Sequence, residues 1–148
     1  MYTKEEASAV RTKFWTSLGK YLKPVPNAEG QSINWINYKT GISQIKIKAD
    51  VQNGFAFAVV EISGEAEMRN TIFETFKRLG FAWQTETVIL ENEWNESNKQ
   101  VHQFLTNLDN VSVFRESDWP AIISFFKTNL LAFDVFWCEY KDFISLGI

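Results

Sequence analysis

The chain has one histidine and one cysteine, His102 and Cys138, and these are its first candidates for chemistry. Nucleophilic catalysis of the triad type requires a base beside its nucleophile. His102 follows Val101 in a short alternating segment, which favours a surface histidine, solvent-facing or hydrogen-bonded, over a catalytic one. No residue near Cys138 in the sequence would lower the pKa of its thiol, so we expect an inert side chain. The sequence therefore argues against a catalytic triad.

Local motifs for cofactors and metal ions are missing from the sequence. It contains no Walker loop, no glycine fingerprint for dinucleotides and no ligand spacing typical of zinc or calcium sites. We therefore expect no cofactor and no metal ion. Four acidic residues lie along one predicted strand and just past its end: Glu86, Glu91, Glu93 and Glu96. This pattern is more typical of a sheet edge protected against pairing with other strands than of a metal site.

Residues 34–39 have the side-chain types of a binding surface. They combine aromatic rings, amides and a cation, as base-stacking and ligand-binding surfaces do. In a strand, Trp35 and Asn37 would lie on one face, and Ile36 and Tyr38 on the other. The alternative is that these aromatic side chains pack against the C-terminal helix. With two lysines of the next predicted strand, the candidate binding residues are Trp35, Asn37, Lys39, Lys46 and Lys48.

A long amphipathic helix, Trp119–Ile144, must anchor the elements that position these side chains. Apolar or aromatic residues recur along it every three or four positions, at Trp119, Ile122, Phe126, Leu130, Phe133, Trp137, Tyr140 and Ile144. Leu131 and Val135 fall on the far side of the helix and also need cover. Either the chain covers both sides, or the outer side meets a second copy. We favour a homodimer through this helix, because isologous pairing needs no further element.

The rest of the chain predicts two more helices and a sheet. A capping box, Thr3 with Glu6, begins a helix over residues 4–22, and a second helix covers residues 65–79 before Gly80. Strands are predicted at residues 33–38, 42–51, 55–62, 83–94 and 100–105, followed by a polar link and an apolar segment at 111–114. The order is helix, three-strand meander, helix, two strands and long C-terminal helix. This order indicates one α+β domain, residues 1–148, with an antiparallel sheet.

The pair Asn53-Gly54 is the strongest local signal, because it is typical of a two-residue type I′ hairpin turn. Such a turn places Val51 opposite Ala56 and makes one face of the hairpin wholly apolar. The other face is mixed, and on it Lys46 lies opposite Glu61 as a cross-strand ion pair.

Composition excludes several classes of protein. A net charge of −3 argues against a protein that grips nucleic acid by bulk electrostatics, although a local basic patch remains open. A single cysteine cannot form an internal disulfide, which favours the cytoplasm. The first residues are polar where a secretory signal is apolar, and no segment approaches the roughly 18 uninterrupted apolar residues of a membrane span. We expect no membrane association.

The order of elements is similar to the core of restriction-endonuclease-like folds, in which an Asp and a Glu-x-Lys on adjacent strands hold a catalytic metal ion. Asp50 and the segment Glu61–Ser63 occupy the analogous places. The resemblance implies, as an alternative, a divergent nuclease that uses Asp50, Glu61 and Lys48 with Mg²⁺. The sequence departs from the pattern because Ser63 stands where the lysine belongs. The predicted register also separates the two carboxylates by roughly 13 Å, too far for one metal ion.

Four segments carry a second resemblance, which extends over nearly the whole chain: Phe14-Trp15, Asn34–Gly41, Asn110–Phe114 and Asp118–Lys127. Together they resemble an uncharacterised bacterial family, a domain of unknown function found both free-standing and joined to nuclease-type domains. The resemblance implies association with DNA restriction or repair and assigns no catalytic residue. We therefore expect a non-enzymatic binding or interaction domain, accessory to nucleic-acid processing, whose partner is a protein or a nucleic acid.

Overall fold

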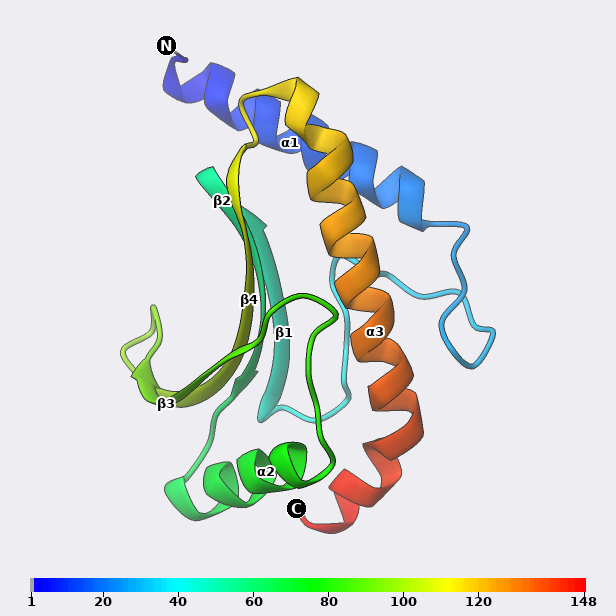
Figure 1. The fold of residues 1–148 in the computed structure, drawn as a ribbon, viewed down its shortest axis with the longest axis vertical. Coiled ribbons are helices and arrows are strands. Elements are labelled where there is room, and N and C mark those ends of the chain that lie inside the picture. Colours follow the sequence, from blue (N-terminus) through cyan, green and yellow to red (C-terminus); the bar gives the residue numbers. More distant parts are fainter. Residues whose placement is uncertain (1) are drawn as a thin grey trace.

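The chain folds into a four-stranded antiparallel sheet and three α-helices (Figure 1). The computed structural model describes residues 2–148. Along the chain, the elements are α1 (Lys4–Leu22), β1 (Ile45–Val51), β2 (Asn53–Ile62), α2 (Ala66–Arg78), β3 (Val88–Trp94), β4 (Gln100–Ser112), a 3-10 turn (Glu116–Asp118) and α3 (Trp119–Leu146). This order confirms the α+β class and the long C-terminal helix.

The helix ends follow local chemistry and agree with the sequence. Thr3 accepts a hydrogen bond from the backbone N of Glu6, and the Glu6 carboxylate accepts one from the backbone N of Thr3, which completes the predicted capping box of α1. α2 stops just before Gly80, whose φ of 74° is a left-handed conformation that glycine adopts without strain.

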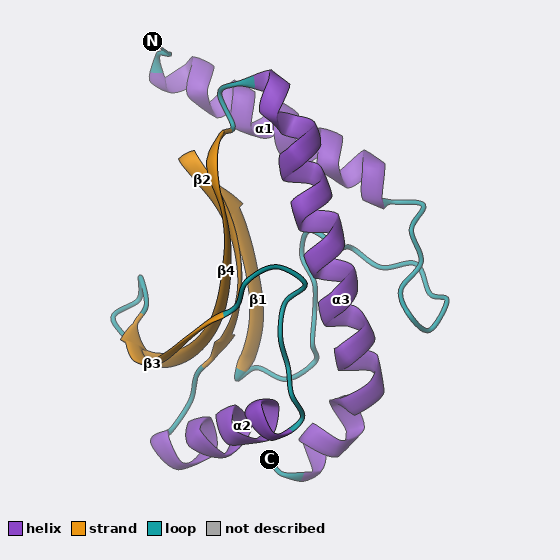
Figure 2. Cartoon of the chain, in the orientation of Figure 1, coloured by secondary structure: helices purple, strands orange, loops and turns teal. Residues whose placement is uncertain are grey.

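The sheet has the strand order β1-β2-β4-β3, so β1 and β3 form its edges. In Figure 2, α3 runs along one face of the sheet, while α1 and α2 lie towards its two ends. No helix of residues 2–148 covers the opposite face, which we call the outer face. It carries Lys46, Lys48 and Asp50 of β1, Phe55, Phe57, Val59 and Glu61 of β2, and Gln103, Leu105, Asn107 and Asp109 of β4.

The β1–β2 hairpin has the predicted register, with Lys46 opposite Glu61. Its turn is different. Gly54 has a φ of 120°, whereas Asn53 lacks the positive φ that a type I′ turn requires. Asn53 is instead a strand residue that pairs with Ser112 of β4. The loop still has two residues, since the backbone N of Gln52 donates to the carbonyl of Phe55 at 2.8 Å, and this loop length preserves the predicted register.

Residues 33–38 do not form the predicted strand. Asn34 Oδ1 accepts hydrogen bonds from the backbone N of Ile36 and of Asn37, both at 3.2 Å, and these bonds bend the chain. The segment belongs to a long connection, residues 23–44, and β1 begins only at Ile45. The sheet consequently has four strands where five were predicted.

The predicted strand at residues 83–94 is shorter than expected, because β3 begins at Val88. Trp83 turns into the core, where it is 4% exposed and its indole donates a hydrogen bond to the carbonyl of Phe104 at 2.8 Å. Thr87 Oγ1 accepts from the backbone N of Trp83 at 2.8 Å and closes a turn. Burial of one large side chain thus overrides the strand propensity of this segment.

The second predicted strand of this half is longer than expected, because β4 continues from Gln100 to Ser112. The supposed polar link is its second half. Thr106 faces the core at 0% exposure, whereas Asn107 and Asp109 lie on the exposed outer face. β4 therefore becomes an interior strand of the sheet.

One side of α3 packs in two apolar clusters. Near its start, Phe126 joins a cluster with Phe14 of α1, and further along Phe133 joins one with Phe104 of β4. The stretch Glu116–Leu146 is nevertheless long and apolar enough to cross a membrane by length and composition, which the sequence analysis did not expect. One such helix is weak evidence for a membrane span, because core helices of soluble proteins pass the same test, and α3 is partly buried against the rest of the chain here.

The other side of α3 is exposed in part. Val135 is 57% exposed and Phe143 is 54% exposed. Leu131, predicted to lie on the far side, is instead half-buried against the cluster that contains Phe126. The exposed apolar face therefore lies nearer the C-terminal end of the helix than expected.

Candidate functional site

Four of the five candidate binding residues line one depression at the β1 edge of the sheet. It has a volume of about 340 Å³, and its lining includes Asn37, Lys39, Lys46 and Lys48. The first two come from the connection that precedes β1, and the other two alternate along β1. The fold thus brings together three lysines from two separate segments.

Thr40 holds the connection against the start of β1. Its hydroxyl donates to the carbonyls of Ile42 and Ile45, at 3.0 and 2.8 Å, and accepts from the backbone N of Ile42 at 3.1 Å. These bonds fold residues 40–45 into a tight turn. Lys39 is therefore carried to the strand on which Lys46 lies.

Two of the three lysines are available to a ligand. Lys39 and Lys46 are exposed, and neither forms an ion pair within residues 2–148. An ammonium group is a compact cation with three donors, suited to phosphate or carboxylate oxygens. The depression can therefore bind an anionic group, although the net charge of the chain is −3.

Trp35, the fifth candidate, lies elsewhere. It is 3% exposed, and its indole donates a hydrogen bond to the carbonyl of Val25 at 2.8 Å. Tyr38 packs edge-to-face on Phe133 of α3, with ring centroids 5.5 Å apart. The alternative interpretation, in which these aromatic side chains pack against the C-terminal helix, is therefore the correct one for Trp35 and Tyr38.

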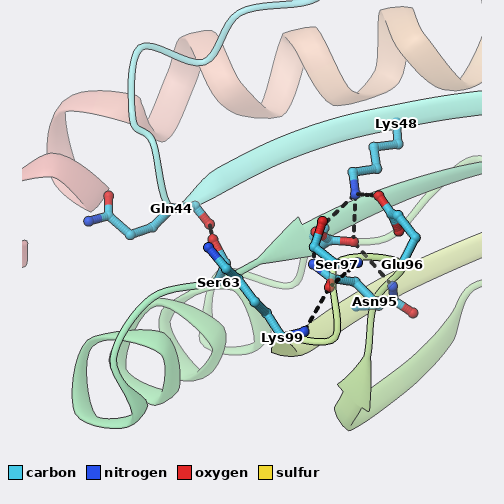
Figure 3. Close-up of polar contacts among 9 residues, drawn as sticks. Gln44, Lys48, Ser63, Asn95, Glu96, Ser97 and Lys99 are labelled. Carbon is cyan, nitrogen blue, oxygen red and sulfur yellow. Dashed lines mark hydrogen bonds and ion pairs between the residues drawn. The ribbon is translucent and has the colours of Figure 1, made fainter.

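Lys48, the third lysine, is held by carboxylates on the outer face (Figure 3). Its Nζ lies 3.1 Å from both carboxylate oxygens of Glu61 and 2.6 Å from Oε1 of Glu96. The cross-strand pair thus uses Lys48, and not Lys46 as predicted. Burial acts to lower the pKa of Lys48, but the bonds to Glu96 and Glu61 outweigh it and raise that pKa. The bond from Lys48 lowers the pKa of Glu96.

Glu61 is 4% exposed because the loop between β3 and β4 closes over it. Asn95 of that loop donates to Glu61 Oε1 at 3.1 Å, and Gln103 of β4 donates to Oε2 at 3.5 Å. With Lys48, these groups occupy both carboxylate oxygens. Glu61 is therefore a saturated buried acceptor.

Asp50 is separated from Glu61 as the register predicted. It lies opposite Phe57, and its carboxylate accepts hydrogen bonds from the backbone N of Val51 at 2.8 Å and from the side chain of Gln52 at 2.9 Å. Among residues 2–148, no three His, Cys, Asp or Glu side chains come together in a group that could hold a metal ion. The two candidate nuclease carboxylates thus serve separate networks.

Comparison with known proteins places this geometry in a family. A family model described as Domain of unknown function (DUF4268) matches residues 10–141, which include the whole sheet and the lysine-lined depression. The chain belongs to the DUF4268 family. Neither the curated proteins nor the solved structures gave a match. The expected membership in an uncharacterised domain family is thereby confirmed.

A polar anchor that the sequence analysis missed fastens the connection to α3 in this DUF4268 domain. Asp134 is 1% exposed and accepts hydrogen bonds from the backbone N of Ala28 at 2.7 Å and from the hydroxyl of Tyr38 at 2.5 Å. Burial and the bond to Asp134 raise the pKa of Tyr38. The sequence signal for this anchor is the position of Asp134, a lone carboxylate on the apolar stripe of the helix directly after Phe133.

A second depression of the DUF4268 domain, about 390 Å³, lies between this connection and α3. Trp137 and Cys138 of α3 line it, with Tyr38 and several amides of the connection. Burial is the main cause that raises the pKa of the Cys138 thiol to about 11, which agrees with the expected inert side chain.

His102 is a buried residue of the DUF4268 sheet, which corrects the surface position predicted for it. It is 2% exposed and stacks on Phe73 of α2, with ring centroids 4.3 Å apart. Its Nδ1 accepts a hydrogen bond from the backbone N of Asn92 at 3.1 Å, and its Nε2 lies 2.7 Å from Asn70 Oδ1. Burial, and next the charge of Arg69, lower the pKa of His102.

Proposed function

We propose that the chain is a non-enzymatic binding domain, accessory to nucleic-acid processing, which holds phosphate groups at the lysine-lined depression. The observation that carries this proposal is the meeting of Lys39 and Lys46, two exposed lysines without an ion pair within residues 2–148, in one depression beside Asn37. Amide and ammonium donors together suit the oxygens of a phosphodiester backbone.

Binding of this kind is weak and sensitive to salt. Each neutralised phosphate contributes a slope of about −0.9 to log K against log salt for duplex DNA, and about −0.7 for single strands. Two lysines therefore predict a slope of log K against log salt of about −2 or shallower. The net negative charge of the chain repels phosphate and weakens binding further. An accessory domain, which adds to the affinity of a neighbouring module, fits such a contribution.

The proposal extends to the setting of the protein. We infer a bacterial, cytoplasmic protein that works beside nuclease-type domains. The single cysteine and the resemblance carried by Phe14-Trp15 and Asn34–Gly41 support this inference.

Fluorescence anisotropy with labelled single-stranded and duplex oligonucleotides, at about 50 mM salt, tests the proposal. Replacing both Lys39 and Lys46 by Gln should weaken binding about tenfold and reduce the salt slope. The matched control replaces Lys4 and Lys20, two exposed lysines of α1, and should weaken binding less. Equal losses in both pairs, or no binding by the wild type, would contradict the proposal.

A divergent Mg²⁺-dependent nuclease is the second candidate. It is favoured by one observation: Lys48 reaches Glu61 from the neighbouring strand and so supplies the lysine that Ser63 does not. The separation of Asp50 from Glu61 weighs against it. We expect no cleavage of plasmid DNA with Mg²⁺ or Mn²⁺. Reproducible cleavage that Asp50→Ala or Glu61→Ala abolishes would establish the nuclease instead.

A further inference from the structure

Two phenylalanines project from the outer face of the sheet. Phe55 and Phe57 lie two residues apart on β2, so both point to the same side, and their ring centroids are 6.2 Å apart with planes 32° from parallel. Phe55 is 40% exposed and Phe57 is half-buried. β2 is an interior strand, and the two rings lie near the β1–β2 turn at one end of the sheet.

The sequence around these rings resembles a known base-stacking strand. Gly54-Phe55-Ala56-Phe57 matches the centre of the pattern K/R-G-F/Y-G/A-F-V-x-F/Y, whose aromatic side chains stack bases on an open four-stranded sheet. The match is partial, since Asn53 replaces the basic residue, Ala58 replaces the valine and Val60 replaces the last aromatic. The strand position agrees with the pattern, because the rings lie on an interior strand and on the face without a helix.

We propose that the outer face binds single-stranded nucleic acid by stacking bases on Phe55 and Phe57. This inference rests on the proposed function and specifies its ligand. The rings are sequence-tolerant platforms, because every base has an aromatic face. In a duplex those faces are stacked within the helix, so only an unpaired strand can use them.

The charges on the outer face set the orientation of the bound nucleic-acid strand. Lys46 lies on the same face of β1, four residues from the position opposite Phe57, which is roughly 13 Å along the strand. Asp50 lies opposite Phe57, and Asp109 lies opposite Phe55. These carboxylates repel phosphates and accept hydrogen bonds from base amino groups. The backbone is therefore expected over the lysines, and the bases over the rings.

Three labelled probes test the inference: a twelve-residue oligothymidine, an abasic strand of equal length and charge, and a duplex. Oligothymidine should bind the wild-type chain at least about fivefold more tightly than the abasic strand, since one stacked base contributes about that much or more. Phe55→Leu with Phe57→Leu keeps apolar volume without rings and should abolish this difference. Phe55→Tyr with Phe57→Tyr keeps the rings and should preserve it.

The matched control replaces Tyr21 and Phe143 by Leu, two exposed aromatic residues far from β2 in the sequence, and should leave the preference intact. If the Leu pair on β2 binds oligothymidine as the wild type does, stacking is wrong, while loss of binding in the Lys39→Gln with Lys46→Gln variant would still support the phosphate site. If the wild type binds none of the three probes, both proposals fail.

Discussion

Lys48 Nζ lies 3.1 Å from each carboxylate oxygen of Glu61 and joins β1 to β2 across the outer face. The two partners are unequally buried, since the side chain of Lys48 is 31% exposed and that of Glu61 is 4% exposed. The carboxylate therefore depends on the lysine more than the lysine depends on the carboxylate.

Removing the lysine alone should cost more than removing the pair. Lys48→Met leaves a buried carboxylate with only amide donors, and we expect the free energy of unfolding to fall by about 2 kcal/mol. Lys48→Met combined with Glu61→Leu should recover part of that loss. Urea unfolding of the single and double variants measures both values. A double variant that is less stable than Lys48→Met would contradict the argument.

Removing Asp134 should loosen the connection before β1. Asp134→Ala leaves the backbone N of Ala28 and the hydroxyl of Tyr38 without their acceptor, which should lower the free energy of unfolding by about 2 to 4 kcal/mol. Protease cleavage within residues 23–44 should become faster. Tyr38→Phe removes one donor and keeps the carboxylate, so it should cost less. Unchanged cleavage in Asp134→Ala would show that other contacts hold the connection.

Acid should weaken the fold through His102. Its lowered pKa means that, as the pH falls below the ordinary value of 6.5, the unfolded chain takes up a proton more readily than the folded chain does. The contribution of the neutral ring to stability is thus fully present above pH 6.5 and is lost as the pH falls through the lowered pKa. Denaturant unfolding between pH 7.5 and 5 should show less pH dependence in His102→Gln. Equal pH dependence in both proteins would rule out this role.

The exposed side of α3 should form a C2 dimer. Val135→Glu with Phe143→Glu should give a folded monomer, because both side chains lie in the exposed apolar face. Leu131 is unsuitable for this test, since glutamate there would also disturb the core cluster that it contacts. Sedimentation of the wild type and of this variant measures the change. A wild-type chain that stays monomeric at high micromolar concentration would disprove the dimer.

The features predicted well from the sequence depend on local spacing. The capping box at Thr3, the apolar stripe of α3 and the alternation on either side of Gly54 all act within a few residues. The failures depend on distant partners. Residues 33–38 have strand-forming side chains. They form part of a connection instead, because the indole of Trp35 donates to the carbonyl of Val25 and the backbone N of Ile36 donates to the side chain of Asn34. The second half of β4 is polar because no helix of residues 2–148 lies over one face of the sheet, and the sequence does not show that this face is exposed.

The same distinction holds for the site. Alternation along β1 was enough to place Lys46 and Lys48 on one face. It gave no reason to place Lys39 beside them, because that contact requires the turn held by Thr40. The burial of His102 was equally hidden, since it depends on the packing of α2 against β4.

The strand order also sets the order of assembly. β1 with β2, and β3 with β4, are neighbours in sequence, and hairpins of this kind form in about 1 to 10 μs. β2, however, pairs with β4, from Asn53 with Ser112 to Ile62 with His102. Each of these residue pairs closes a loop of the chain that contains α2 and β3. Such closure is entropically costly until many contacts form at once. The folding rate should therefore be limited by the docking of two preformed hairpins along β2 and β4, with α3 closing over the joined sheet afterwards.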